Sequence, residues 1–91
     1  MYELVKKILE TSKENKVDIG VAYDMIANAT AYTDELKQAF EILRRYYEVI
    51  TELRRKHKEA DINIICKMAE KGNDIGIQHH IENLKDQGVL D

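Results

Sequence analysis

Apolar residues recur along this chain at intervals of three and four positions, which is the period of an α-helix with one buried face. The strongest such pattern begins at Thr33, a residue suited to a helix N-cap, and two acids favoured in a first helical turn follow it. Two adjacent sets of apolar residues then form one wide stripe: Leu36, Phe40, Leu43, Tyr47 and Ile50, and Ala39, Ile42, Tyr46, Val49 and Leu53. This pattern predicts one long helix from Thr33 to about Glu59, with a wide apolar face that several neighbours can cover.

The length of this predicted helix is itself informative. At 1.5 Å per residue it would be about 39 Å long, whereas a compact domain of this chain length is only about 30 Å across. We therefore expect the helix to bend, to end before Glu59, or to project from the domain. The alternative that it continues through Ala60 to Lys71 stays open at this point.

Two shorter apolar patterns precede the long helix. The first predicts a helix over residues 2–15, with one stripe made of Leu4, Val5, Ile8 and Leu9. Asp18 is suited to the N-cap of a second helix, because its carboxylate can accept hydrogen bonds from backbone N–H groups of the first turn. The apolar stripe of this second helix is formed by Val21, Ala22, Met25, Ile26 and Ala29. Its exit and a short connection are expected over residues 28–32.

Two further patterns follow the long helix. Asp61 is a candidate N-cap for a fourth helix that ends at Gly72, and Asp74 is a candidate N-cap for a last helix that ends at Gly88. Together the patterns predict an all-α fold: a small helical bundle of four to five helices organised around one long central helix. Residues 1–91 are expected to form a single helical domain.

Composition and charge restrict the class of protein. Charged residues make up 34% of the chain and apolar residues 44%, which is typical of a globular chain and not of a disordered or membrane-embedded one. The formal net charge is −3, which argues against a protein that coats nucleic acid by bulk charge. Only residues 33–60 carry a net positive charge, +1 from seven basic and six acidic side chains.

The compartment can also be inferred. The chain has one cysteine, Cys66, so it cannot form an intramolecular disulfide, and we expect a reducing environment. Its first residues do not have the basic start and apolar run of a signal peptide, and no transmembrane segment is expected. These features predict a cytoplasmic protein without membrane association.

No residue pattern predicts catalysis, a cofactor or a metal site. His79 and His80 are adjacent, so on a helix their side chains point about 100° apart and cannot share one ion. Cys66 lies within an apolar stripe, where a cysteine usually packs as a small hydrophobic residue. The chain contains no Ser-His-acid order and no glycine-rich phosphate loop. We therefore expect a protein that is not an enzyme.

The predicted long helix carries the candidate partner-binding residues, which are Tyr46, Tyr47, Arg44, Arg45, Arg54, Arg55, Lys56 and Lys58. Adjacent tyrosines cannot easily face one core, so one of the pair is expected to contact a partner; tyrosine suits interfaces because its ring is apolar and its hydroxyl can stay hydrated. Steps of ten or eleven residues return to nearly the same helix face, which aligns Arg44 with Arg54 or Arg55 in a basic ridge. Such a ridge could contact phosphates, or it could be a solvated helix end interleaved with glutamates.

The leading hypothesis is a small non-enzymatic interaction protein: an adaptor, inhibitor or regulator that binds another macromolecule, with a protein the expected partner. Self-association, as a dimer, is expected through the wide apolar face of the long helix. The alternative is a nucleic-acid-binding regulator that uses the basic ridge or a helix-turn-helix-like C-terminal pair. In that alternative, the residues that would face bases are Gln78, His79, Asn83 and Gln87.

Overall fold

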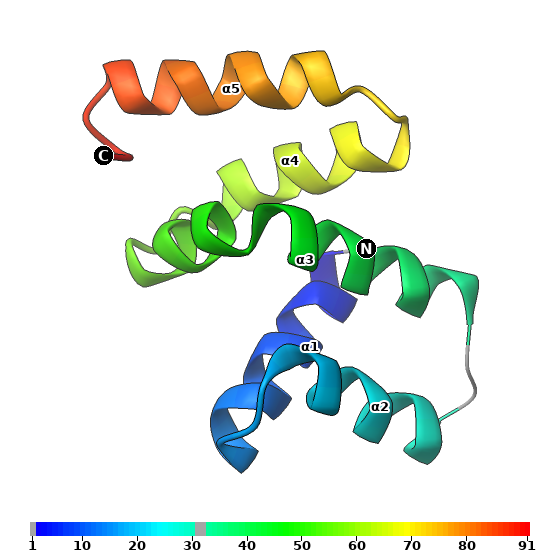
Figure 1. Ribbon diagram of the computed structural model, residues 1–91. Helices are drawn as coiled ribbons and strands as arrows, with labels where there is room; N and C mark the ends of the chain where they lie inside the picture. Colours follow the sequence, from blue (N-terminus) through cyan, green and yellow to red (C-terminus); the bar gives the residue numbers. More distant parts are fainter. Residues whose placement is uncertain (1, 31–32) are drawn as a thin grey trace. The chain divides into compact units, whose positions relative to one another are not determined.

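The computed structural model describes residues 2–30 and 33–91, and these residues form five α-helices and no strand. The helices, drawn in Figure 1, are α1 (Tyr2–Asn15), α2 (Ile19–Ala29), α3 (Asp34–Arg55), α4 (Glu59–Glu70) and α5 (Asp74–Asp86). The predicted all-α fold is therefore confirmed. The predicted exit of the second helix reaches residues 31 and 32, which lie outside the described residues; the helix itself ends at Ala29.

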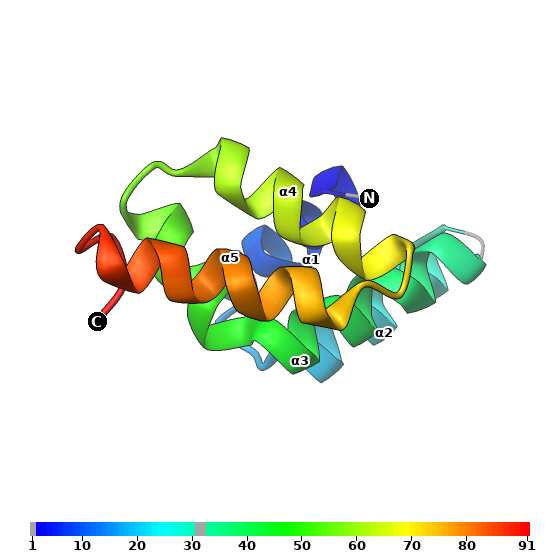
Figure 2. The ribbon, with the colours of Figure 1, turned by 90° about the horizontal axis from the view of Figure 1, so that it is seen from above.

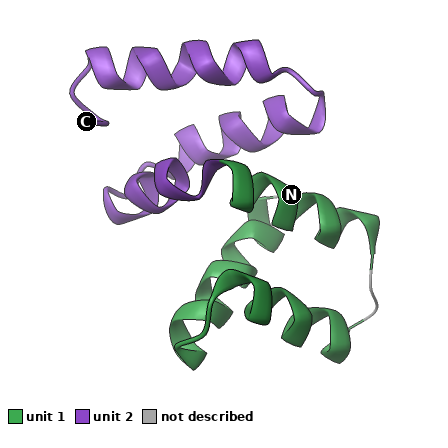
Figure 3. Cartoon of the chain, viewed as in Figure 1, with its two compact units in different colours: residues 1–45 green, residues 46–91 purple. Residues whose placement is uncertain are grey.

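The chain divides into two compact units, Met1–Arg45 and Tyr46–Asp91, coloured separately in Figure 3. The boundary lies inside α3, where Tyr46 has the non-helical backbone angles φ −120° and ψ 28°. The longest helix thus contributes its first part to unit 1 and its last part to unit 2. The single domain expected over residues 1–91 stays a prediction.

Unit 1 is built from α1, α2 and the first part of α3, with α1 packed against α2. Its buried apolar side chains come from all three segments and include Val5, Ile8, Leu9, Ala22, Ile26, Leu36, Ala39, Ile42 and Leu43. The rings of Tyr23 and Phe40 stack with their centroids 4.5 Å apart and connect α2 to α3. The guanidinium of Arg44 lies 5.8 Å from the centre of the Phe40 ring.

Unit 2 is built from the last part of α3, α4 and α5. Helices α4 and α5 pack against each other and run in opposite directions, as both Figure 1 and Figure 2 show. The buried apolar side chains of this unit are Tyr46, Ile50, Leu53, Ile62, Ile65, Cys66, Ile77, Ile81, Leu84 and Leu90. Every helical segment of the unit therefore contributes to its core.

Four of the helices end in the same way. The residues after their last turns, Lys16, His57, Gly72 and Gly88, have positive φ angles of 55°, 59°, 68° and 77°. In each case the N–H of the next residue donates to the carbonyl oxygen five residues earlier, at 2.8–3.1 Å. This is the Schellman arrangement, which satisfies a carbonyl group left unpaired at a helix end. The predicted helix ends at Gly72 and Gly88 are therefore correct.

The structure corrects the predicted extent of the long helix. The helix bends at Tyr46 and ends at Arg55, before the predicted end near Glu59, because His57 adopts a left-handed conformation that stops it. Continuation to Lys71 is accordingly wrong. Helix α4 begins at Glu59, so Asp61 lies in its first turn and is not its N-cap.

Asp18 occupies the predicted N-cap position of α2, although its side chain accepts no hydrogen bond there. Thr33 caps α3 as predicted, since its Oγ1 accepts a hydrogen bond of 3.1 Å from the N–H of Leu36. The prediction of Asp74 as the cap of α5 is wrong by one residue. Asn73 is the cap, and its Oδ1 accepts a hydrogen bond of 3.0 Å from the N–H of Gly76.

A pair of glycine substitutions tests the role of the left-handed helix ends. Nothing lies within 4 Å of a Cβ added at Gly72 or at Gly20, so neither substitution causes a clash. Gly72→Ala should lower the free energy of unfolding by about 1–2 kcal/mol, because alanine is strained at positive φ. Gly20→Ala lies in the first turn of α2 and should raise it by a smaller amount, up to about 0.5 kcal/mol. Urea unfolding followed by circular dichroism measures both changes, and effects of the same sign would contradict this account.

Candidate partner-binding surface

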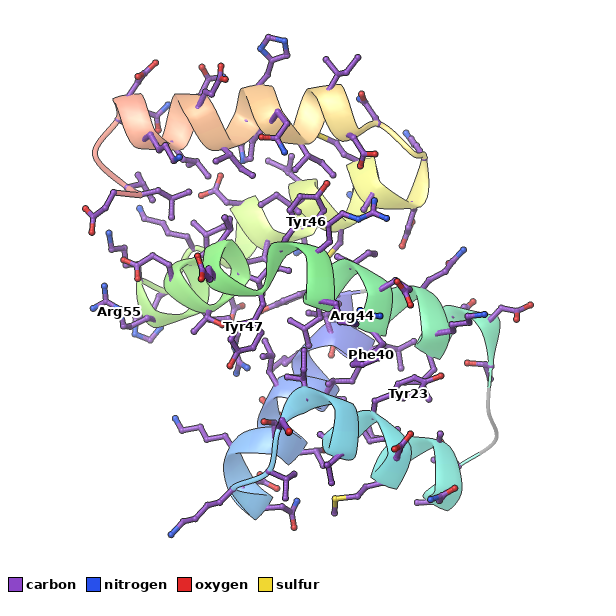
Figure 4. The ribbon with its side chains drawn as sticks, in the orientation of Figure 1. Tyr23, Phe40, Arg44, Tyr46, Tyr47 and Arg55 are labelled. Atoms are coloured by element: carbon purple, nitrogen blue, oxygen red, sulfur yellow. The ribbon has the colours of Figure 1, made fainter. Side chains whose placement is uncertain are left out.

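The structure separates the two adjacent tyrosines of α3. Tyr46 is only 7% exposed, and its hydroxyl donates a hydrogen bond of 3.1 Å to Oδ1 of Asp74 at the start of α5. Tyr47 is 42% exposed. In Figure 4 the two side chains leave α3 on different sides, with Tyr46 directed toward α5. Of the two predicted partner-binding tyrosines, Tyr46 belongs to the core of unit 2 and Tyr47 lies on the surface.

Tyr47 begins a line of exposed side chains along the last part of α3. Thr51 and Arg55 follow it at steps of four residues, and both are exposed. Residues spaced by four lie on one face of a helix, so these three residues form one surface, which we call the Tyr47 surface. Its chemistry is an aromatic ring at one end and a guanidinium at the other, with a small hydroxyl-bearing side chain between them.

The acidic side chain of Glu52 holds two of the predicted cations. Nη2 of Arg55 lies 2.7 Å from Oε1 of Glu52, and Nζ of Lys56 lies 3.1 Å from the same oxygen. The hydrogen bonds from Arg55 and Lys56 lower the pKa of Glu52, and the bond to Glu52 raises the pKa of Arg55. The cationic character of this helix end is therefore partly neutralised within the chain.

Lys56 has a second role that no sequence pattern indicated. Its ammonium group also donates a hydrogen bond to the carbonyl oxygen of Val89, 33 residues further along the chain. This bond holds the C-terminal segment, whose Leu90 is buried, against the end of α3. Lys56 is thus half-buried and contributes to the fold of unit 2 more than to a free basic surface.

The six predicted cations are divided between the two units. Arg44 and Arg45 lie in unit 1, and Arg54, Arg55, Lys56 and Lys58 lie in unit 2. Arg44 also forms an ion pair of 3.7 Å with Glu41, one turn earlier. The predicted alignment of Arg44 with Arg54 or Arg55 assumed an unbroken helix, and the non-helical angles at Tyr46 interrupt that helix. An unbroken helical period therefore does not relate these residues, and the basic ridge stays a prediction.

Several exposed apolar side chains lie outside the predicted partner-binding residues. Val21 and Met25 of α2 are 45% and 39% exposed, although the sequence pattern placed both in an apolar stripe. Ile64 of α4 and Ile75 of α5 are also exposed, Ile75 by 74%. Periodicity alone could not find them, because it identifies an apolar face without showing whether another element covers it.

The cysteine and the two adjacent histidines considered for catalysis or metal binding lie in different environments. Cys66 is buried, and this burial raises the pKa of its thiol to about 11. Nε2 of His80 lies 3.1 Å from Oδ1 of Asp61, which connects α5 to α4, while His79 is exposed. Within residues 2–30 and 33–91, no three His, Cys, Asp or Glu side chains gather in a way that could hold a metal ion.

Comparisons of the chain with protein families, with curated proteins and with solved structures find no significant match. Among the described helices, none combines the length and the apolar character needed to cross a membrane.

The different environments of the two tyrosines can be tested by removing each hydroxyl group. Tyr46→Phe should lower the free energy of unfolding by about 1 kcal/mol, because it removes the hydrogen bond to Asp74. Tyr47→Phe is the matched control and should leave stability unchanged, since this hydroxyl lies on an exposed side chain. Thermal or urea unfolding measures both, and equal effects would contradict the assignment of Tyr46 to the core.

The burial of Cys66 predicts slow alkylation of the native protein. At pH 8 a thiol of pKa about 11 is about a hundredfold less ionised than an unperturbed cysteine thiol, whose pKa is 9.0, and the thiolate is the reactive form. Iodoacetamide should therefore modify the native chain at least about a hundredfold more slowly than the urea-unfolded chain. Mass spectrometry follows the reaction at this single cysteine, and similar rates in the two states would show that the thiol is accessible.

Proposed function

We propose that this protein is a small non-enzymatic adaptor, inhibitor or regulator that binds another macromolecule, with a protein as its principal partner. The observation that carries the proposal is the exposure of Tyr47 on the same helix face as Arg55. Tyrosine and arginine are the residue types that, with tryptophan, dominate the energetically important positions of protein interfaces. The single cysteine is consistent with a cytoplasmic location, which we include in the proposal.

Tyr47 leaves part of its side chain in contact with solvent. A tyrosine that is 42% exposed has enough uncovered surface to contribute roughly 2 kcal/mol when a partner covers it. The ring is also rigid, so its burial costs less conformational entropy than that of a long flexible side chain. Arg55 adds a planar guanidinium that can donate further hydrogen bonds to a carboxylate.

Self-association is part of the proposal, but the surface first predicted for it is not available. Leu36, Ala39, Ile42, Leu43, Tyr46, Ile50 and Leu53, which form most of the wide apolar face of α3, are all buried within the chain. A second copy would therefore have to bind elsewhere.

Affinity capture with matched variants tests the proposed function. Tagged wild-type protein should retain a partner from a lysate of its native host, and Tyr47→Ala should reduce that retention at least about tenfold, which corresponds to roughly 1.4 kcal/mol. Glu82→Ala, an exposed substitution on α5, is the control and should retain the partner. Circular dichroism verifies that each variant is folded. Equal retention by the wild type and Tyr47→Ala would contradict the role of the Tyr47 surface.

Nucleic acid is the second candidate partner, supported by the four cations Arg54, Arg55, Lys56 and Lys58 at the end of α3. The pairing of Arg55 and Lys56 with Glu52 makes this candidate weaker. The antiparallel packing of α4 and α5 also differs from the crossed helices typical of a DNA-binding helix-turn-helix. Nuclease treatment of the captured material distinguishes the two candidates, because only a nucleic-acid partner is lost, and its binding weakens steeply with salt.

A further inference from the structure

The outward face of α2 is apolar and acidic. Val21, Asp24 and Met25 are all exposed, and their spacing of three and four residues places them on one side of the helix. Asp24 is the single charged residue of α2, and Asp18, immediately before the helix, is a second exposed acid. We call the surface made by Val21, Asp24 and Met25 the α2 face. Its two large apolar side chains, Val21 and Met25, are exposed one turn apart, and α2 contains no basic residue.

The outward face of α4 is apolar and basic. Ile64 and Lys67 of α4 and Lys71, the residue that follows the helix, are exposed at steps of three and four residues, and the half-buried Met68 lies beside them. The opposite side of the helix buries Ile62, Ile65 and Cys66 in the core of unit 2. We call the surface made by Ile64, Lys67, Met68 and Lys71 the α4 face. Within the described residues, neither of its lysines forms an ion pair.

We propose that the α2 face of one copy of this protein binds the α4 face of a second copy. This inference rests on the self-association included in the proposed function and identifies the surfaces that carry it. The two faces complement each other in apolar surface and in charge. Val21 and Met25 can cover Ile64 and Met68, and the carboxylate of Asp24 can pair with the lysines. Complementary charges of this kind set the orientation and the partner of an interface.

The charges also disfavour the two symmetric pairings. Two α2 faces brought together would place Asp24 of one copy near Asp24 of the other, and two α4 faces would oppose four lysines. Like charges in an interface weaken it and so favour the mixed pairing. Because each copy has both faces, the contact joins unlike surfaces, and such contacts close into a symmetric assembly or extend into a chain of copies.

Charge exchange between the two faces tests this proposal. In sedimentation over a wide range of protein concentration, the average mass of the wild type should rise with concentration. Asp24→Lys alone and the pair Lys67→Glu with Lys71→Glu should each weaken the association at least about tenfold. Glu82→Lys is the matched control: it makes the same change of charge on an exposed position of α5 and should associate like the wild type.

The decisive measurement is the mixture of the two weakened variants. The new lysine at position 24 of one variant faces the two glutamates of the other, and the remaining pair of faces is wild type. Mixing should therefore restore association, and a single chain carrying all three substitutions should associate with itself. A wild type that stays monomeric at every concentration, or a mixture that stays dissociated, would overturn the proposal.

The two proposals can fail separately. Tyr47→Ala changes neither face, so it should leave self-association unchanged while it weakens capture of the partner. Asp24→Lys changes a residue outside the Tyr47 surface. Loss of partner capture in Tyr47→Ala, together with unchanged self-association in Asp24→Lys, would support the proposed function alone. Unchanged capture in Tyr47→Ala, together with weakened self-association in Asp24→Lys, would support the α2 and α4 faces alone.

Discussion

A chain without proline has to end its helices by another means, and in this protein a backbone residue in the left-handed region does so four times. At each of these ends a hydrogen bond joins the following N–H to a carbonyl oxygen of the last turn. The rest of unit 2 depends on this constraint. If His57 were helical, α3 and α4 would form one straight rod, and the buried residues of α4 could not share one core with those of the last part of α3.

The same constraint explains how much of the fold could be predicted. The ends of α4 and α5 were predicted correctly because Gly72 and Gly88 occupy them, and glycine adopts positive φ without steric cost. The ends of α1 and α3 depend on Lys16 and His57, whose side chains carry no such signal. Packing of the flanking apolar residues has to compensate for their strain, and packing is a tertiary property. The length of α3 was therefore overestimated, although its apolar face was predicted correctly.

The candidate site was predictable in composition but not in geometry. The sequence identified the tyrosine pair, whereas the backbone at Tyr46 and the hydrogen bond to Asp74 decide which ring is buried. It identified the cations at the end of α3, but not that Glu52 and the carbonyl group of Val89 engage Lys56. The exposed faces of α2 and α4 were missed for a similar reason. An apolar stripe predicts burial, but only the arrangement of neighbouring helices determines how much of the stripe they cover.

Isolated apolar side chains are common on protein surfaces and need no explanation. The arrangement in this protein differs, because the exposed apolar residues of α2 and α4 are accompanied by charges of opposite sign. The Tyr47 surface shares no residue with either face, so every copy of the proposed assembly would contribute its own Tyr47 surface to a partner. Linked copies raise the effective concentration of that surface for a partner with repeated sites. The proposed self-association would therefore strengthen the proposed binding to such a partner.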